Sequence, residues 1–362
     1  MAEKKSERKT VTIISRESDT PSVDIQMLAD ELRGRGIDVN VMCRLLRKEK
    51  SLKSLSYIGE LARQARAIKR SSVVVVDTYI IPVSLLPHSN DTKVVQTWHA
   101  LSAIKKFGWQ TVGKEGGSSA STARIMRMHK GYDYVVCCSD VTAWYFCDAF
   151  GVERSKIVKA GLPRIDYIND VVHGSKKEDC LKRIYEKYPQ LRPEELDGKR
   201  IVLYAPTFRK GKAVDISGLS AALDAEKYVL IAKTHSLDIL SDDAELSSNI
   251  IADSAIDSCD WLATADIIVS DYSSFVVEAS LAGKPLYIYA YDMDEYDETV
   301  GLNIDYSKEA IAPYVFKEAD ELAKALDAEY DTALLSEFRD KYIDIDTNNC
   351  TADLADFIES LM

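Results

Sequence analysis

The sequence predicts an α/β protein with two doubly wound, Rossmann-like domains, and three observations lead to this prediction. The chain has 362 residues, of which 46% are hydrophobic. Chains longer than about 300 residues usually form more than one hydrophobic core. Short β-rich runs alternate with amphipathic helical stretches, which is typical of a parallel sheet covered by helices. This alternation is interrupted over residues 161–198 and then resumes. We therefore expect one domain on each side of this junction.

The first alternating stretch predicts the N-terminal domain, residues 1–168. Its strands are expected at residues 11–14, 39–43, 73–77, 93–96, 134–138 and 156–159. Its helices are expected at residues 23–35, 52–70, 121–131 and 140–150. Each strand of this domain is short and apolar, as a strand buried on both faces must be.

The second stretch predicts the C-terminal domain, residues 169–344. It follows a junction in which glycines and prolines surround one charged helix, residues 176–188. Strands are expected at residues 201–204, 228–233, 250–252, 267–270 and 285–289, and later helices at 274–282, 318–326 and 333–342. We expect the last segment, residues 345–362, to pack back on the first domain.

Composition excludes several classes of protein. The net charge of -12 and the pI near 5.1 argue against nucleic-acid binding, which requires surplus Lys and Arg. The seven cysteines are scattered in apolar runs without metal-ligand spacing, so we expect reduced thiols and no bound metal. Because the apolar runs are shorter than the roughly 18 residues of a membrane span, we expect a cytoplasmic protein, soluble or peripheral to the membrane.

Polar motifs follow several of the predicted strands, at the edge where open parallel sheets bind ligands. His99 follows the strand at 93–96, where a histidine can act as a general base near neutral pH. Trp98 precedes it, and Lys105 and Lys106 add positive charge nearby. The alternative is a hydrogen-bonded histidine in a turn.

Two further motifs end strands of the second domain. Thr207 and Arg209 close residues 204–209, and a hydroxyl beside a guanidinium suits phosphate. Lys233 and His235 lie two residues apart, so both side chains point to the same side of a strand and could face one anion, the donor phosphate. The alternatives are a surface arginine in a turn and a solvent-exposed strand end.

The run from residue 266 to 274 predicts a buried strand that enters a helix near Ser274. Asp271, Ser273 and Ser274 stand at this junction, where hydroxyls and first-turn N–H groups favour an anionic ligand. Ordinary N-capping by Ser273 or Asp271 explains one of these polar residues but not all three. We therefore expect a phosphate-binding site here.

Two charged segments indicate a function less specifically. Residues 44–70 contain nine Lys or Arg and two Glu, and their helix groups Leu55, Ile58, Ala62 and Ala65 on an apolar face. We favour a helix that covers the sheet with a solvated outer face over one that rests on anionic lipid. Residues 292–298 form an acidic run that we expect to be a solvated loop, with metal binding as a weaker alternative.

Taken together and in order, five motifs resemble one known family. They are Trp98-His99, residues 161–166 with Arg164, residues 204–209, residues 233–235 and residues 271–274. The chain resembles the CDP-glycerol glycerophosphotransferases, the teichoic acid primases and polymerases, over roughly residues 93–306. Each motif alone is weak, but the ordered set is specific.

The resemblance implies a GT-B fold, with two Rossmann-like domains facing a cleft, and a defined reaction. Glycerol phosphate would pass from CDP-glycerol to a hydroxyl of a polyprenyl-diphosphate-linked saccharide at the inner membrane face, and CMP would leave. The N-terminal domain would bind the acceptor and the C-terminal domain the CDP-linked donor. His99 would be the base, His235 would bind or neutralise the donor diphosphate, and Thr207, Arg209, Ser273 and Ser274 would complete the phosphate site. The residues that would bind the acceptor or support the site are Trp98, Lys105, Lys106 and Arg164. Phosphoryl transfer depends on positioning and charge neutralisation, so we expect neither a metal nor a cofactor.

Three alternatives stay open at this point. A CDP-ribitol-dependent enzyme of the same family differs only in the length of the polyol. A GT-B glycosyltransferase that uses a UDP- or GDP-sugar shares the fold. A non-catalytic protein that binds a wall-polymer precursor would need the same pockets without the chemistry.

Overall fold

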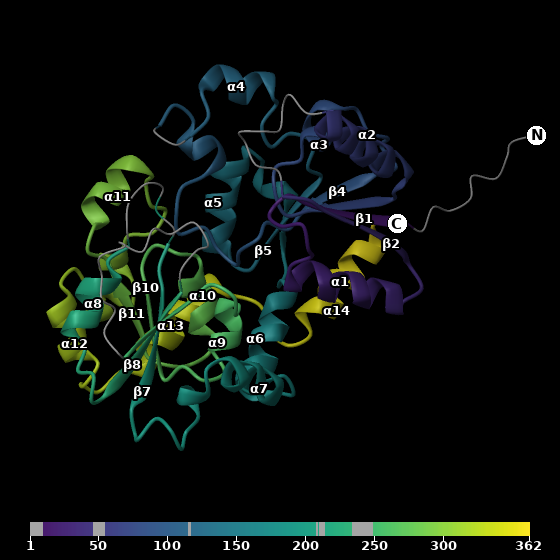
Figure 1. Ribbon diagram of the computed structural model, residues 1–362. Coiled ribbons are helices and arrows are strands. Elements are labelled where there is room, and N and C mark those ends of the chain that lie inside the picture. The colour runs from purple at the N-terminus through teal and green to yellow at the C-terminus, as the bar shows by residue number, and fades with distance from the viewer. Residues whose placement is uncertain (1–9, 46–54, 115–116, 208, 210–213, 234–248) are drawn as a thin grey trace, which may run out of the picture. The chain divides into compact units, whose positions relative to one another are not determined.

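The computed structural model describes residues 10–45, 55–114, 117–207, 209, 214–233 and 249–362 (Figure 1). The chain forms two compact units. Unit 1 comprises Met1–Asp166 together with Tyr342–Met362, and unit 2 comprises Tyr167–Lys341. The chain therefore leaves unit 1, completes unit 2 and returns to unit 1.

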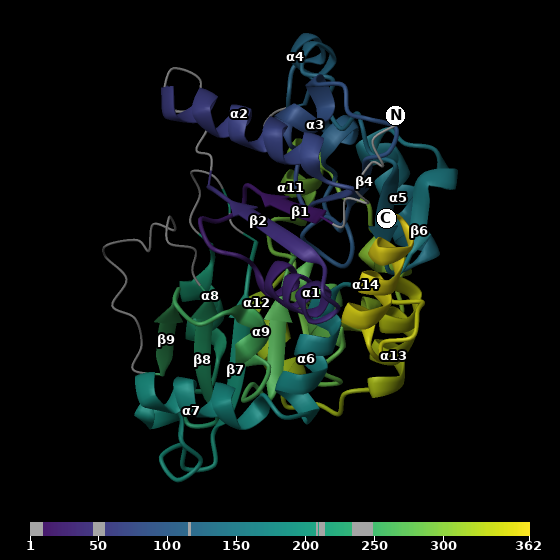
Figure 2. The same ribbon diagram turned by 90° about the vertical axis from the view of Figure 1, so that its right-hand side faces the viewer.

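Unit 1 is built on a six-stranded parallel sheet in the order β2-β1-β3-β4-β5-β6. The strands are β1 (Thr10–Ser15), β2 (Asp38–Cys43), β3 (Val73–Val76), β4 (Lys93–Gln96), β5 (Tyr134–Cys137) and β6 (Ile157–Lys159). Helices α1 (Val23–Gly34) and α14 (Cys350–Ser360) lie on one side of the sheet, and α2 (Leu55–Arg70) and α3 (Ile81–Leu85) on the other (Figure 2). All four residues of β3 are buried, as expected for a strand covered on both faces.

Local sequence signals explain where the helices of unit 1 begin and end. Helix α1 starts at Ser22, whose hydroxyl accepts a hydrogen bond from the Ile25 amide, and it buries a stripe with helical spacing: Ile25, Leu28, Ala29 and Leu32. Helix α5 (Asp140–Phe150) starts at Ser139 in the same way and ends at Gly151, which is left-handed with φ 64°. The remaining helices are α4 (Ala120–Ile125) and α6 (Pro163–His173), which crosses into unit 2.

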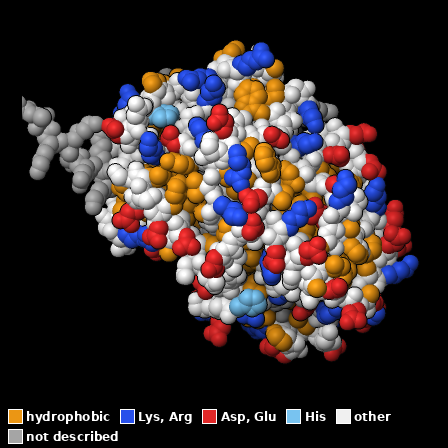
Figure 3. Space-filling model, turned by 180° about the vertical axis from the view of Figure 1, so that it is seen from behind, with side chains coloured by type: hydrophobic (Ala, Val, Ile, Leu, Met, Phe, Trp, Pro, Cys, Tyr) orange, Lys and Arg blue, Asp and Glu red, His pale blue; other side chains and the backbone are white. Residues whose placement is uncertain are grey.

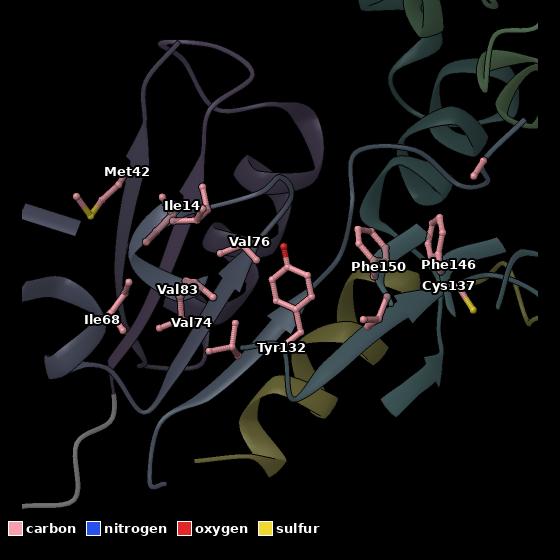
Figure 4. Close-up of a cluster of buried hydrophobic side chains, with 14 of the residues drawn as sticks. Ile14, Met42, Ile68, Val74, Val76, Val83, Tyr132, Cys137, Phe146 and Phe150 are labelled. Carbon is pink, nitrogen blue, oxygen red and sulfur yellow. The ribbon is translucent and has the colours of Figure 1, made fainter. Parts of the chain in front are cut away.

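The core of unit 1 runs from Met42 and Ile68 through the valines of β3 to an aromatic cluster on α5 (Figure 4). Phe150 is 1% exposed and lies at the centre of this cluster. Its ring centroid is 4.9 Å from that of His129, 5.1 Å from that of Phe107 and 5.4 Å from that of Trp98. The core therefore extends to the loop that follows β4.

Unit 2 contains a second six-stranded parallel sheet, in the order β12-β11-β10-β7-β8-β9. The strands are β7 (Arg200–Ala205), β8 (Tyr228–Lys233), β9 (Ile250–Asp253), β10 (Ile267–Ser270), β11 (Leu286–Tyr289) and β12 (Val315–Phe316). The helices are α7 (Lys177–Lys187), α8 (Ile216–Ala222), α9 (Ser258–Trp261), α10 (Phe275–Ser280), α11 (Met293–Thr299), α12 (Ala319–Ala325) and α13 (Thr332–Tyr342). Alternate residues of β7, β8, β10 and β11 pack with α8 and α12 in one buried cluster. Because alternate residues of a strand point to the same face of a sheet, these two helices cover one face of the sheet.

Each sheet has one point at which the strand order reverses. In unit 1, β1 is paired with both β2 and β3. In unit 2, β7 is paired with both β8 and β10. Open α/β sheets bind their ligands outside the carboxyl ends of the strands at such switch points. The residues after β1 and β3, and those after β7 and β10, are therefore where a site is expected.

The structure corrects two elements expected from the sequence. The helix expected at residues 121–131 ends at Ile125, because Arg127 (φ 47°), His129 (φ 57°) and Gly131 (φ 94°) are left-handed and interrupt it. The acidic run at residues 292–298 is not a loop: helix α11 covers most of it. The aromatic ring of Tyr296 in α11 stacks on Tyr272 with centroids 4.5 Å apart.

Helix α2 does not bury the apolar face identified in the sequence. Ile58 is 59% exposed and Ala62 is also exposed. The buried side chains are instead Tyr57, Glu60, Gln64 and Ile68, which lie three to four residues apart on the opposite side of the helix. The outer face therefore combines apolar residues with the exposed cations Arg63, Arg66, Lys69 and Arg70.

Acidic, basic and apolar side chains are interspersed over the face of the molecule shown in Figure 3. Among the helices that the structure describes, none is long and apolar enough to cross a membrane.

We predict that Phe150→Ala lowers the free energy of unfolding by about 3–4 kcal/mol, because it opens a cavity in the aromatic cluster. The matched control is Trp144→Ala on the same helix, since Trp144 is 63% exposed and its removal should cost within about 0.5 kcal/mol. Urea unfolding of the three proteins measures both effects. Equal losses in the two variants would contradict the core assigned here.

Candidate functional site

In unit 1, His99 lies just beyond the end of β4, and a main-chain contact sets its tautomer. Its Nδ1 lies 3.1 Å from the carbonyl oxygen of Asp77, the residue that follows β3. Because a carbonyl oxygen only accepts hydrogen bonds, Nδ1 carries the proton and donates it. The lone pair is then on Nε2, which is the arrangement that a general base requires.

The surroundings of His99 keep its imidazole neutral. Burial lowers its pKa below the ordinary value of 6.5, the charges of Arg164 and Lys105 lower it further, and Glu17 opposes them. A neutral imidazole at pH 7 can accept a proton without first losing one.

Trp98 adopts a strained backbone conformation beside this histidine. Its φ of 59° is left-handed, which costs a bulky residue on the order of 1–3 kcal/mol. Its amide donates to the side-chain oxygen of Gln96 at 2.8 Å, and its ring stacks on Phe107 with centroids 4.2 Å apart. The Trp98 and His99 rings have centroids 4.0 Å apart, so this loop holds the imidazole by packing as well as by hydrogen bonding.

The three basic residues predicted near His99 lie in different settings. Arg164 forms an ion pair with Asp24, and its backbone amide also donates to Asp24 at 2.7 Å. Lys105 is half-buried and close enough to affect the pKa of His99. Lys106 is half-buried and follows it. A role for these residues in binding the acceptor stays a prediction.

In unit 2, the predicted residues Thr207, Arg209, Asp271 and Ser273 meet at the switch point between β7 and β10. The Asp271 side chain is fully buried and accepts from the Thr207 amide at 2.9 Å and from the Thr207 hydroxyl at 2.8 Å. It also accepts from the Ser273 amide at 3.1 Å and from Arg209 at 2.8 Å. The Tyr306 hydroxyl donates to its carbonyl oxygen at 2.8 Å.

Arg209 is 6% exposed, and protein acceptors already occupy most of its N–H groups. Nε and Nη2 donate to the two carboxylate oxygens of Asp292 at 2.7 and 2.8 Å, and Nη1 donates to Asp271 and to the Thr207 carbonyl. Three tyrosine rings surround the guanidinium, with centroids 5.1 to 5.5 Å away: Tyr272, Tyr291 and Tyr296. The predicted contact of Arg209 with a phosphate stays a prediction.

The two predicted serines differ in what their hydroxyls do. The Ser273 hydroxyl accepts from the Phe275 amide at 3.3 Å. Ser274 stands at the N-cap of α10 and makes no side-chain capping bond. Both serines are partly exposed, whereas the neighbouring Asp271 is buried.

Lys233, at the end of β8, is held by a second buried carboxylate. Its Nζ donates to Asp253 at 2.9 Å. Asp253 also accepts from Lys187, Tyr188 and Trp261 at 2.9, 2.8 and 3.1 Å. These donors, against the effect of burial, hold the pKa of Asp253 well below its usual range. His235 lies outside the described residues, so its predicted role stays a prediction.

Sequence reasoning missed several polar residues at the strand ends. Asp292 and Asp253 were missed because their partners lie 83 and 20 residues away along the chain. Asp77 and Thr78 directly follow β3 and are buried. Their signal in the sequence is the one that also marks His99, polar residues directly after an apolar run. In the described part of the chain no group of three or more His, Cys, Asp or Glu side chains is arranged to hold a metal ion.

The chain is 29% identical over 303 residues to the teichoic acid ribitol-phosphate primase of Bacillus spizizenii, covering 80% of this chain and 75% of that protein. It is 28% identical over 299 residues to the teichoic acid glycerol-phosphate primase of Bacillus subtilis, covering 81% and 74%.

Among solved structures, that of the wall teichoic acid polymerase TagF matches with a TM-score of 0.73 at 20% identity, covering 98% of this chain and 89% of that one. The predicted fold class, a GT-B arrangement of two Rossmann-like domains, is confirmed. A model of the CDP-glycerol:poly(glycerophosphate) glycerophosphotransferase family matches residues 1–360. The chain therefore belongs to the CDP-glycerol:poly(glycerophosphate) glycerophosphotransferase family, as its motifs predicted.

Proposed function

We propose that this enzyme transfers a polyol phosphate, with glycerol phosphate favoured, from a CDP-polyol to a hydroxyl of a polyprenyl-diphosphate-linked saccharide. The observation that carries the proposal is the setting of His99 in a chain of this family. The Asp77 carbonyl fixes the proton on Nδ1, and burial together with nearby cations lowers the pKa of the ring. The result is a neutral base at a strand end.

In the proposed reaction, the acceptor oxygen attacks the phosphorus that carries the polyol. A new P–O bond forms, the bond from that phosphorus to the bridging oxygen breaks, and CMP leaves with the bonding electrons. His99 Nε2 takes the proton of the acceptor hydroxyl. Such a transfer depends on positioning and charge stabilisation, which side chains supply in this proposal without a metal or a cofactor.

We assign the donor to the switch point of unit 2. The Asp271 network holds the loop after β7 against the start of α10. One guanidinium in this network faces two carboxylates, so the buried cluster is not positive overall. In this proposal the donor phosphates bind the hydroxyls of Ser273 and Ser274, and His235 supplies positive charge. Arg209 positions the network rather than contacting phosphate.

CDP-ribitol is the second candidate donor, because the relatives named above include a ribitol-phosphate primase as well as a glycerol-phosphate primase. A CMP-release assay with each CDP-polyol and a lipid-linked disaccharide acceptor separates the two. Release from neither would refute the proposed function, and transfer from a UDP-sugar alone would favour a glycosyltransferase of the same fold.

We further propose that the enzyme acts at the cytoplasmic face of the membrane and that α2 contacts it. The outward face of α2 carries Ile58, which is 59% exposed, together with exposed arginines and Lys69. The acidic residue of the helix, Glu60, is buried. A helix face that combines apolar groups with cations suits a surface of anionic lipid.

We predict that His99→Ala reduces kcat for CMP release by at least 100-fold, because general-base catalysis contributes about 10²–10⁴-fold. Since the pKa of His99 lies below 6.5, the wild-type rate should hold as the pH falls to 6.5 and decline only below it. His129→Gln is the matched control, because His129 is buried in the aromatic cluster of the same unit. An unchanged rate in His99→Ala would refute the assignment of the base.

We predict that Arg209→Lys lowers the free energy of unfolding by about 3 kcal/mol, because an ammonium does not bridge both carboxylates and leaves buried charge unpaired. Arg200→Lys is the control. Arg200 also pairs with an aspartate and lies over a tyrosine ring, but its side chain is 45% exposed, so its loss should cost under about 1 kcal/mol. Thermal unfolding of both variants provides the comparison, and similar losses would count against the network.

We predict that Arg66→Gln with Arg70→Gln weakens binding to phosphatidylglycerol vesicles by about tenfold or more, since each cation contributes about 1 kcal/mol near an anionic surface. Lys182→Gln with Arg192→Gln removes two exposed cations from unit 2 and should leave binding unchanged. Vesicle co-sedimentation measures the bound fraction. Equal binding by the two double variants would show that α2 is not the contact.

A further inference from the structure

Three buried polar atoms gather at the switch point of the first sheet without a hydrogen-bond partner among the described residues. They are Arg16 Nε, Asp77 Oδ1 and Thr78 Oγ1. Arg16 directly follows β1, and Asp77 and Thr78 directly follow β3. Folded proteins leave few buried polar groups unpaired, and each exception calls for a physical explanation. Their shared position, where this type of sheet binds ligands, indicates a ligand as that explanation.

A small cavity lies beside Asp77. Its volume is about 20 Å³, and its lining includes His99, Asp77, Asp24, Ser22 and Thr97. A cavity of about 10–15 Å³ on this measure holds one water-sized group. The space therefore suits a single hydroxyl.

The charges around the cavity favour a neutral group. Burial, together with the nearby carboxylates Glu17 and Asp24, raises the pKa of Asp77 to about 7, against the Ser15 and Thr78 hydroxyls. The nearby cations have acceptors: Arg164 pairs with Asp24, and Arg16 donates to the Tyr79 carbonyl at 2.8 Å. The positive charge of Lys105, in the loop after β4, lowers the pKa of His99. A phosphate would be repelled by these carboxylates, whereas a hydroxyl would donate to Asp77 Oδ1.

We infer that Asp77 binds a hydroxyl of the acceptor saccharide next to the hydroxyl that His99 deprotonates. The inference rests on the proposed function and assigns this part of the site to the acceptor. Asp77 then has two contacts with separate effects. Its backbone carbonyl positions the His99 ring, and its carboxyl group selects a neutral, hydroxylated acceptor over a phosphorylated one.

The test is Asp77→Asn, which keeps the backbone carbonyl and the size of the side chain but removes the charged acceptor. Because a hydrogen bond to a charged group contributes about 1.5–3 kcal/mol, the KM for a synthetic lipid-linked disaccharide should rise by about ten- to 100-fold. The KM for the CDP-polyol that the wild type uses should stay within about twofold. Asp133→Asn is the matched control: Asp133 accepts from the Val94 amide at 2.8 Å at the opposite, amino-terminal edge of the same sheet.

Stability distinguishes this role from a structural one. The pKa of Asp77 is higher in the folded chain than its ordinary value of 3.8, so the wild type loses stability as the pH rises from 3.8 through about 7. Asp77→Asn lacks this loss and should melt at the same or a higher temperature at pH 8. A variant that is no less stable yet binds the acceptor more weakly supports the inference.

An unchanged acceptor KM in Asp77→Asn, or a parallel rise in both KM values, would overturn the inference. A wild type that releases no CMP from either CDP-polyol would instead overturn the proposed function. In that case, calorimetric titration of the wild type and Asp77→Asn with the disaccharide still decides the inference. Equal binding, or binding by neither protein, refutes it.

Discussion

The buried carboxylate of Asp271 is the interaction on which the arrangement of unit 2 depends. It joins the loop after β7 to the turn after β10 by accepting from Thr207, Arg209 and Ser273. A buried charge is tolerated only when it is paired and hydrogen-bonded, and here the donors come from both strand ends. The geometry of the predicted phosphate site is thus assembled by the protein's own contacts, as preorganised electrostatic sites require.

The two units use the same position in their sheets in different ways. Asp77 and Asp271 each directly follow a strand beside the switch point, β3 in one sheet and β10 in the other. Asp271 has its oxygens fully used by protein donors, whereas Asp77 Oδ1 has no partner in the described chain. A saturated carboxylate stabilises a loop, and an unsaturated one remains available for chemistry or recognition. The two aspartates occupy equivalent positions in their sheets but differ in their hydrogen-bond partners. This difference distinguishes the proposed acceptor site in unit 1 from the proposed donor site in unit 2.

Much of the fold was predictable because its signals are local. Apolar runs bounded by polar residues located the strands, and the ordered motifs around His99, Thr207 and Asp271 identified the family. The site was harder to predict because its partners are remote. Arg209 was expected to contact phosphate, which stays a prediction. Its carboxylate partners Asp271 and Asp292 lie 62 and 83 residues away along the chain, and no local pattern reveals such a pair.

The elements that were wrong or incomplete share a similar cause. The left-handed residues after α4 break a helix whose composition allows it to continue. Helix α11 contains no buried residue, so it lacks the apolar periodicity by which a helix is recognised. Ring stacking by Tyr296 and the contacts of Asp292 hold it in place. On α2, the apolar residues were identified correctly but not the side of the helix that packs on the sheet.

The return of the chain to unit 1 affects how the protein is made. Helix α14 packs on α1, and the backbone amides of Cys350 and Thr351 donate to Asp166 at 2.9 and 2.7 Å. On a ribosome, where domains fold as their residues emerge, every residue of unit 2 precedes residue 342. Unit 1 starts first but finishes last, so its α1 face remains uncovered until translation has passed the end of unit 2. Contacts of α14 thus complete folding of the unit that holds His99.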